Sequence, residues 1–370
     1  MVSWEAPSSA QAGRAIRPRR FRRWHGGPPS TSQKTGKPSR PDVGSPIIID
    51  TDAGTDDILA LSYLLSLPDL QIEAITIVHG LAHVREGSRN IRRLLHLAGR
   101  ADIPVLEGAE SPLEGSRPFP AEWRFVANNL PGVTLPDIVG PPSTQGAVDF
   151  LKRRMLDRER PVRILGLGPL TNLALALREM PDASATVKEL LIMGGALQVP
   201  GNLSAGNPEK AANEVAEWNI YVDPHAAVEV FKSDIQMLLV PLDATMHVPI
   251  TRSFVENFGR RSLTPLGRVA AQVLEAALPY IDAHAYFAWD PLAAVALVDR
   301  SVLQAKKATI QVTTGGQNIG QTKLIRWDAD SPLAVSMDVN AAAFTAEFEQ
   351  TLGGFNTKTQ RHKDTKKGRN

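Results

Sequence analysis

Hydrophobic residues along this chain recur in short continuous runs, and amphipathic stretches separate the early runs from one another. Continuous apolar runs of this length are typical of strands that are buried on both faces. Runs of this kind predict strands at 47–49, 71–80, 103–109, 162–168, 189–196 and 237–245. Helical patterns lie between them, at 58–67, 85–99, 144–157, 169–180 and from 223 onwards. Such regular alternation favours a mainly parallel sheet with helices on both faces.

The last third of the chain departs from this rhythm. It predicts helices over most of 251–278 and from 288, a hairpin at 308–315 and 322–327, and one more strand and helix over 332–352. Residues 110–142 are rich in Pro and Gly, residues 197–216 are polar, and both are interpreted as loops. The predicted fold class is α/β, with a single open, mainly parallel, Rossmann-like sheet, helices on both faces and a small late β-hairpin.

Charge divides the chain into a body and two tails. Residues 1–45 carry nine Lys or Arg against two acids, and residues 355–370 carry six against one. Few apolar residues accompany these charges, so both segments are predicted to be disordered basic tails around one domain at 46–354. The body is left with 26 basic and 36 acidic residues. A surface of that sign disfavours nucleic acid as a partner.

Composition places further limits on the chain. A hydrophobic content of 43% and a charged content of 22% are those of a soluble globular protein. The absence of cysteine excludes disulfides and thiolate metal sites. No apolar run reaches the roughly 18 residues that span a bilayer, so no membrane partner is expected. We expect a cytoplasmic protein, although the Arg- and Ser-rich start also permits organellar targeting.

The densest chemistry follows the first predicted strand. Asp50, Asp52, Asp56 and Asp57 stand within eight positions, between the strand at 47–49 and a helical run. Open α/β sheets bind their ligands at the carboxyl ends of such strands. Four crowded carboxylates repel one another unless they protonate or a cation neutralises them. Hard oxygen ligands without cysteine or a nearby histidine favour Ca²⁺ or Mg²⁺. The alternative is a helix start with ordinary capping acids, which needs only one or two of them.

Several motifs in fixed order resemble one enzyme family. IIIDTDAGTDDILAL, LGPLTNLALAL, IMGGA, AEWNIYVDP, PLDAT and WDPLAAV resemble the calcium-dependent inosine–uridine preferring nucleoside N-ribohydrolases, over about 46–352. The resemblance implies hydrolysis of the N-glycosidic bond of ribonucleosides, with Ca²⁺ as cofactor. It also implies a homo-oligomer.

The resemblance implies a metal site built from both ends of the chain. Asp52, Asp57 and Asp290 would ligate Ca²⁺ through their carboxylates, and Leu167 through its backbone carbonyl. A main-chain ligand tolerates any side chain, so leucine is acceptable there. Asp52 is also the expected proton acceptor for the attacking water. Carboxylates in such a site stabilise the oxocarbenium-like transition state of glycoside cleavage.

The same resemblance implies a set of ribose-binding residues. They are Asp56, Asn202, Glu217 and Asn219. The loop at 197–216 is long, so Asn207 and Asn213 compete with Asn202 for its role.

Three positions depart from the family pattern. Ala53 replaces a proline, which could loosen the metal site, and Leu81 replaces an asparagine that lines the pocket. Trp289 stands where many members have a histidine that acts as the acid for the leaving base. Members that prefer purines resemble this chain in having tryptophan there, and an indole can stack on a purine. Trp289 is therefore a candidate catalytic residue, with Trp123 as a candidate for the second face of the base.

Two alternatives to a purine-leaning nucleoside hydrolase stay open at this point. The departures at Ala53 and Leu81 also fit a homologue that binds nucleosides with weak or no turnover. The segment Asp50-Thr51-Asp52-Ala53-Gly54-Thr55 is similar to the start of haloacid dehalogenase-type phosphatases, but it carries one residue too many.

Overall fold

The computed structural model describes residues 44–137, 142–180, 182–204 and 212–353. The predicted tails at 1–45 and 355–370 lie outside these ranges, except for Gly44 and Ser45. Within the described ranges, none of the helices is both long enough and apolar enough to cross a bilayer.

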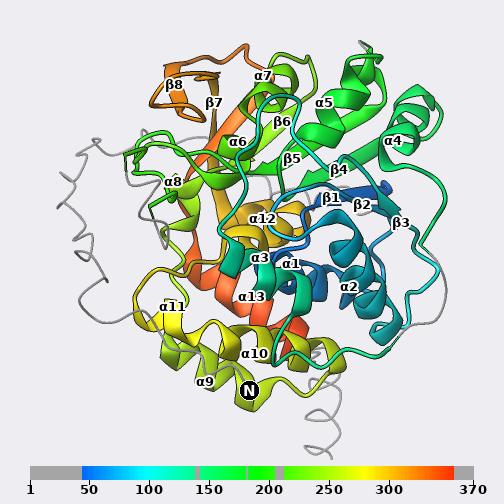
Figure 1. Cartoon of the computed structure of the whole chain (residues 1–370), viewed down its shortest axis with the longest axis vertical. Helices are drawn as coiled ribbons and strands as arrows, with labels where there is room; N and C mark the ends of the chain where they lie inside the picture. Colours follow the sequence, from blue (N-terminus) through cyan, green and yellow to red (C-terminus); the bar gives the residue numbers. More distant parts are fainter. Residues whose placement is uncertain (1–43, 138–141, 181, 205–211, 354–370) are drawn as a thin grey trace, which may run out of the picture.

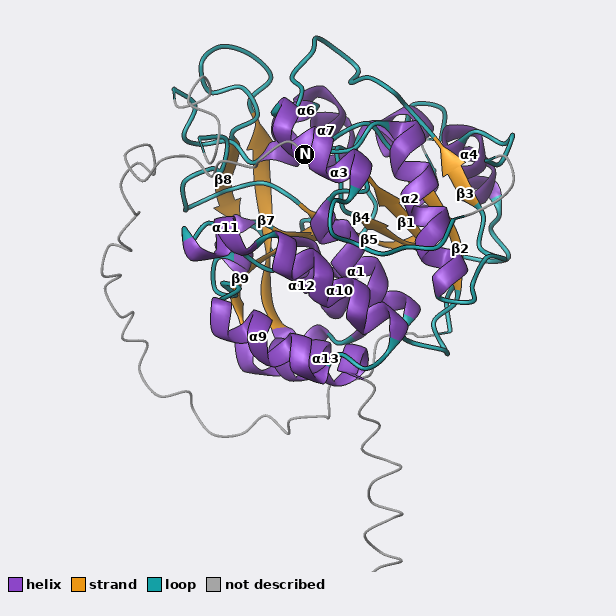
Figure 2. Ribbon diagram, turned by 60° about the horizontal axis from the view of Figure 1, so that its bottom comes forward, coloured by secondary structure: helices purple, strands orange, loops and turns teal. Residues whose placement is uncertain are grey.

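A single nine-stranded sheet organises the described residues, in the order β3-β2-β1-β4-β5-β6-β9-β7-β8. Its strands are β1 Ile47–Thr51, β2 Ile72–Ile77, β3 Val105–Glu107, β4 Val162–Gly166, β5 Val187–Met193, β6 Met237–Val240, β7 Leu303–Val312, β8 Thr322–Trp327 and β9 Leu333–Val339. Every pair from β3 to β9 is parallel, whereas β7 pairs antiparallel with both β9 and β8. The predicted fold class is therefore confirmed, late hairpin included. β3 and β8 lie at opposite ends of the sheet (Figure 2).

Helices cover both faces of this sheet. They are α1 Thr55–Leu65, α2 Val84–Leu97, α3 Ala121–Asn129, α4 Ala147–Leu156, α5 Thr171–Leu177, α6 Trp218–Val222, α7 Pro224–Phe231, α8 Leu242–Thr245, α9 Arg252–Arg261, α10 Pro265–Ala276, α11 Leu278–Asp282, α12 Trp289–Val298 and α13 Ala341–Gly353. In Figure 1, α4, α5 and α7 lie above the sheet, and α1, α2, α10, α12 and α13 lie below it.

The isoleucines of β1 show why this sequence forms a central strand. Ile47 and Ile49 belong to the hydrophobic core on the side of α1 and α12, whereas Ile48 belongs to the core on the side of α5 and α7. All three are fully buried. Alternate side chains of a strand point to opposite faces, so both faces of β1 must be apolar. The strand therefore delivers Asp50 and Asp52 to a fixed place at its carboxyl end.

Two predicted elements were wrong, and each has a local cause. The predicted loop at 110–142 contains α3, which begins after Pro120 and turns Ala127 into the core. Proline and glycine in the flanks masked this short helix. The predicted strand at 237–245 ends at Val240, and the residues after Pro241 form α8. Proline has no N–H to donate to a sheet ladder.

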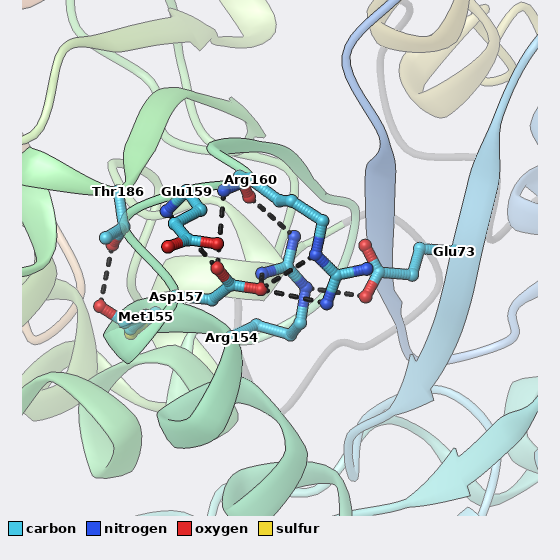
Figure 3. Close-up of polar contacts among 7 residues, drawn as sticks. All are labelled: Glu73, Arg154, Met155, Asp157, Glu159, Arg160 and Thr186. Atoms are coloured by element: carbon cyan, nitrogen blue, oxygen red, sulfur yellow. Dashed lines mark hydrogen bonds and ion pairs between the residues drawn. The ribbon is translucent and has the colours of Figure 1, made fainter.

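Buried ion pairs tie helices to the amino ends of the strands. In Figure 3 the Arg154 side chain lies between Asp157 and Glu73, with N···O distances of 3.3 and 2.5 Å. Arg163 is 3.2 Å from Glu189, which also pairs with Arg300. We call these contacts the amino-end ion pairs. Arg154 and Arg163 are well buried and each has an acidic partner, which offsets the cost of burying its charge.

Candidate metal and substrate site

Carboxylates from distant parts of the sequence meet at the carboxyl end of β1. Asp56 and Asp57 lie in the first turn of α1, and Asp290 lies in the first turn of α12, which packs against α1. One oxygen from each of the three lies within 4.8 Å of the others. Helix N-termini carry a partial positive charge that favours acids at these positions. We call these three residues, together with Asp52, the carboxylate cluster.

The turn between β1 and α1 is held by its own side chains. Gly54 N–H donates to Asp57 Oδ2 at 2.9 Å, the Thr51 hydroxyl donates to Asp57 Oδ1, and Ala53 N–H donates to Thr51 Oγ1 at 3.0 Å. Ala53 adopts a φ of 55° in the left-handed region. Proline is restricted to a φ of about −65°, so this turn has a conformation that the family's proline could not adopt.

Asp52 is enclosed by backbone from two segments, at 80–81 and at 168. Its Oδ2 accepts the Leu81 N–H at 2.7 Å, so residue 81 contacts Asp52 through its backbone whatever its side chain. A Cβ atom on Gly80 would lie 2.1 Å from this same oxygen, and one on Gly168 would lie 2.9 Å from the Asp52 backbone. Both glycines are therefore required for the close approach. The neighbouring Leu167, whose carbonyl is the predicted main-chain ligand, is held by its N–H, which donates to the Asp50 carbonyl at 2.8 Å.

Burial and mutual repulsion dominate the electrostatics of this site. Burial, followed by the charges of Asp52 and Asp56, holds the pKa of Asp57 well above its usual range. Burial and the Asp57 charge do the same to the pKa of Asp290. Burial also raises the pKa of Asp56 and of Glu217 to about 7. Asp57 lies within hydrogen-bonding reach of Asp52 and Asp290. Ionising these acids together therefore needs a cation.

The donor set fits a hard divalent cation. It consists of oxygen atoms alone, and Ca²⁺ prefers six to eight oxygens from carboxylates, carbonyls and water. The grouping that could hold an ion contains Asp57 and Asp290, as predicted, and also Asp56, which was predicted to bind ribose. Asp52, predicted as a ligand, lies beside this group and contributes to the raised pKa of both Asp56 and Asp57.

Two predicted ribose-binding residues form a second wall of the site, at the start of α6. Glu217 begins α6, where its carboxylate accepts the N–H groups of Asn219, Ile220 and Gly195 at 2.9, 3.2 and 2.9 Å. The Asn219 side-chain amide donates to the Leu167 carbonyl at 2.9 Å. The charges of Asp52 and Glu217 act on the same neighbour, Asp56. Glu217 and Asn219 therefore belong to this site, and both also hold the backbone around it.

The structure distinguishes the three asparagines of the loop at 197–216 that were candidates for a ribose contact. Asn202 Oδ1 accepts the Trp218 N–H at 3.1 Å, which places Asn202 at the start of α6. Asn213 instead donates to the Ile319 carbonyl at 2.9 Å. Asn207 lies outside the described residues. Of the described candidates, Asn202 is the one attached to the wall that carries Glu217 and Asn219.

Aromatic side chains gather around the site. Trp289, just before Asp290, is half-buried and packs edge-on against Tyr286 with ring centroids 5.1 Å apart. Trp123 lies on α3 and packs edge-on against Trp218 at 5.9 Å and Tyr280 at 6.4 Å. These partly buried indoles are suited to contact a planar apolar ligand.

Sequence reasoning missed two polar residues of this region. The Thr51 hydroxyl bonds Asp57, and its position between Asp50 and Asp52 was a signal that could have found it. Arg124 of α3 donates to the Gly80 carbonyl at 2.8 Å, and its charge acts on Asp52. No sequence signal pointed to Arg124, because it lies in a stretch interpreted as a loop.

An open, mainly parallel sheet that carries a carboxylate cluster and aromatic side chains near the carboxyl ends of its strands is typical of α/β proteins that bind a small ligand there. Residues 47–346 match the family described as inosine-uridine preferring nucleoside hydrolase, and the chain belongs to that family.

Individual relatives differ in the base they are named for. Uridine nucleosidase 1 of Arabidopsis thaliana is 32% identical over 317 residues, which cover 83% of this chain and 90% of the relative. A pyrimidine-specific ribonucleoside hydrolase of Salmonella agona is 36% identical over 235 residues, covering 64% and 72%. The solved structure of a purine-preferring ribonucleoside hydrolase from Gardnerella vaginalis is similar with a TM-score of 0.71 and 25% identity, covering 84% of this chain and 98% of that one.

Proposed function

We propose that this protein hydrolyses the N-glycosidic bond of ribonucleosides in a Ca²⁺-dependent reaction and prefers purine bases. The observation that carries the proposal is the convergence of Asp57 and Asp290, from opposite ends of the chain, with Asp56 within 4.8 Å. Family membership supplies the reaction class, hydrolysis of nucleosides. The acids supply the negative charge that an oxocarbenium-like transition state requires.

In this proposal each wall of the site has its own role. Asp52, Asp57, Asp290 and the Leu167 carbonyl would hold the cation. When bound, Ca²⁺ would polarise and orient a water molecule and the ribose hydroxyls. Asp52, fixed by the Leu81 N–H, would accept the proton of that water. Asp56, Asn202, Glu217 and Asn219 would bind ribose hydroxyls.

The purine preference rests on Trp289. Its half-buried indole precedes Asp290 directly, so a base above the ribose would meet an aromatic face instead of a protonated imidazole. Stacking gains more from a two-ring purine than from a pyrimidine. The relatives named for uridine and pyrimidines favour the second candidate, a pyrimidine nucleosidase.

A nucleoside panel tests the proposal. Ribose release from inosine, guanosine, adenosine, uridine and cytidine is measured with Ca²⁺ and with a chelator. We expect purine turnover that the chelator abolishes and that Asp57→Asn lowers at least a thousandfold. Asp69→Asn, at an exposed position between α1 and β2, is the matched control. Faster release of ribose from uridine than from the purine nucleosides would contradict the purine preference and support the second candidate, a pyrimidine nucleosidase. Tight nucleoside binding without release from any of them would make the chain a non-catalytic binder.

A further inference from the structure

One peptide group stands between two opposite charges beside the carboxylate cluster. The N–H of Leu81 donates to Asp52 Oδ2 at 2.7 Å, and the carbonyl of Gly80 accepts from Arg124 Nη2 at 2.8 Å. These two atoms belong to the same planar unit, because the Gly80–Leu81 peptide bond joins them. A hydrogen bond at one end of a peptide polarises it and strengthens the bond at the other end. The guanidinium of Arg124 and the carboxylate of Asp52 are therefore connected through a single polarised group.

Arg124 is fixed by the docking of α3 on α2. His83 N–H donates to Asn128 Oδ1 at 2.9 Å at the far end of α3, and Arg89 donates to the Asn128 carbonyl at 2.8 Å. Arg124 itself extends to the Gly80 carbonyl, and its Nη1 lies 3.2 Å from the ring of His83. The helix is thus attached at one end by contacts that do not involve Gly80. Its attachment and its contact with the Gly80–Leu81 peptide can be tested separately.

The charge of Arg124 acts on Asp52 directly as well. It opposes the effect of burial on the pKa of Asp52; burial lowers the pKa of Arg124, and the charge of Asp52 opposes that effect. The largest charge effects on the pKa of Asp57 and Asp290 come from other acids.

We propose that Arg124 is a positioning residue for Asp52: through the Gly80–Leu81 peptide it fixes the N–H that orients the Asp52 carboxylate. This rests on the proposed function, in which Asp52 accepts a proton from water. The side chain of Leu81 has no polar group, so the backbone N–H is the only means by which residue 81 can orient Asp52. Trp123 precedes Arg124 on the same helix, so the position of α3 links the aromatic wall to the reactive carboxylate.

The kinetic test compares three variants of the full chain with Ca²⁺ and the preferred nucleoside. We expect Arg124→Met to lower kcat at least tenfold while KM changes less than threefold, because Asp52 is misaligned without loss of the ribose contacts. Arg124→Lys, which keeps one donor and the charge, should recover part of that loss. Arg89→Met is the matched control, because it removes an arginine contact with α3 and leaves the Gly80 carbonyl bonded. Equal losses of kcat in Arg124→Met and Arg89→Met would overturn the inference, because Arg124 would then act only by holding α3 in place.

A second measurement needs no turnover. Hydrogen exchange of the Leu81 amide, measured in chelator, reports whether its bond to Asp52 is retained. We expect Arg124→Met to accelerate this exchange about tenfold and Arg89→Met to leave it unchanged. An unchanged Leu81 amide in Arg124→Met would overturn the inference. If the unaltered protein cleaved no nucleoside, the proposed function would fail, and the exchange measurement would still decide whether Arg124 fixes this peptide.

Discussion

The two ends of the sheet treat buried charge in opposite ways. At the amino ends, Arg154 and Arg163 are 5% and 4% exposed, and each has an acidic partner within 3.3 Å. At the carboxyl ends, Asp57 and Asp290 are equally buried, and the charges that act on them most strongly are those of other acids. Paired charges serve the stability of the fold, whereas a cluster of like charges is tolerated where a ligand neutralises it. Burial alone does not distinguish the two ends; the identity of the partner does.

The largest effect should come from removing one charge of the carboxylate cluster. Asp290→Asn deletes a proposed ligand and relieves repulsion, so we expect at least a thousandfold loss of kcat/KM together with a more stable metal-free fold. The gain should be about 1 kcal/mol, the scale of one pKa unit of differential interaction. Urea unfolding in chelator and nucleoside turnover in Ca²⁺ measure the two effects. Lower stability of the metal-free variant would show that Asp290 is a structural acid.

Calcium should act on the same end of the sheet and should also stabilise the fold. Because the ion would bind the folded cluster and not the unfolded chain, a concentration a hundredfold above its dissociation constant should stabilise the fold by about 2.7 kcal/mol. Melting temperature followed through a Ca²⁺ titration measures this gain. Asp290→Asn should lose most of it, and Asp69→Asn should keep it. A melting temperature that is insensitive to Ca²⁺ and Mg²⁺ would argue against a cation at the cluster.

Breaking an amino-end ion pair should damage stability and leave chemistry intact. Arg154→Met leaves the carboxylate of Glu73 without its buried partner, whereas Asp157 keeps Arg160, and the change should cost about 3 kcal/mol of unfolding free energy. The value of kcat/KM should change less than twofold. Arg158→Met is the control, because its pair with Asp182 is exposed and should contribute less than about 1 kcal/mol. A loss of activity in Arg154→Met below its melting temperature would contradict the division between the two ends.

A further effect on stability is predicted for a buried titratable group at the carboxyl end that has a hydrogen-bond partner. His79 Nε2 is 2.9 Å from Thr171 Oγ1, which donates to Asp223, and burial lowers the pKa of His79 to about 4. Between pH 6.5 and 4, His79 is therefore protonated in the unfolded chain but remains neutral in the folded state. This contribution to stability is complete above pH 6.5 and is lost as the pH falls towards 4. Between pH 7 and 4.5 the loss should amount to about 2 kcal/mol.

Unfolding free energies at pH 7 and 4.5 measure this contribution. His79→Gln should lose less stability between the two values than the unaltered protein does. His247→Gln, at an exposed position, controls for the loss of an imidazole. If His79→Gln had the same pH dependence as the unaltered protein, His79 would have the same pKa in the folded and the unfolded states.

The sequence predicted the sheet because its signals are local. Three isoleucines buried on alternate faces, a glycine turn and a helix start lie within a few residues of one another around β1. The acids of that turn were found for the same reason. Their meeting with Asp290 came from resemblance to a family, because no local pattern connects positions so far apart. The contact of Arg124 with Gly80 was indicated neither by a local pattern nor by the family resemblance. α3 is short, and its amphipathic pattern is interrupted. The capping role of Glu217 could not be predicted either, because it depends on where the fold places the three N–H groups that donate to its carboxylate.

The left-handed Ala53 has a consequence for how this sequence can change over time. Alanine and proline codons differ by one nucleotide, yet proline at 53 would need a different φ and would remove the N–H that bonds Thr51. Position 87 is constrained together with it, because a Cβ on Gly87 would lie 2.9 Å from that of Ala53. A proline at 53 is thus one nucleotide change away in the gene but needs a different backbone conformation in the protein, whereas glycine adopts a positive φ without strain, so this turn accommodates glycine at 53 more easily than proline.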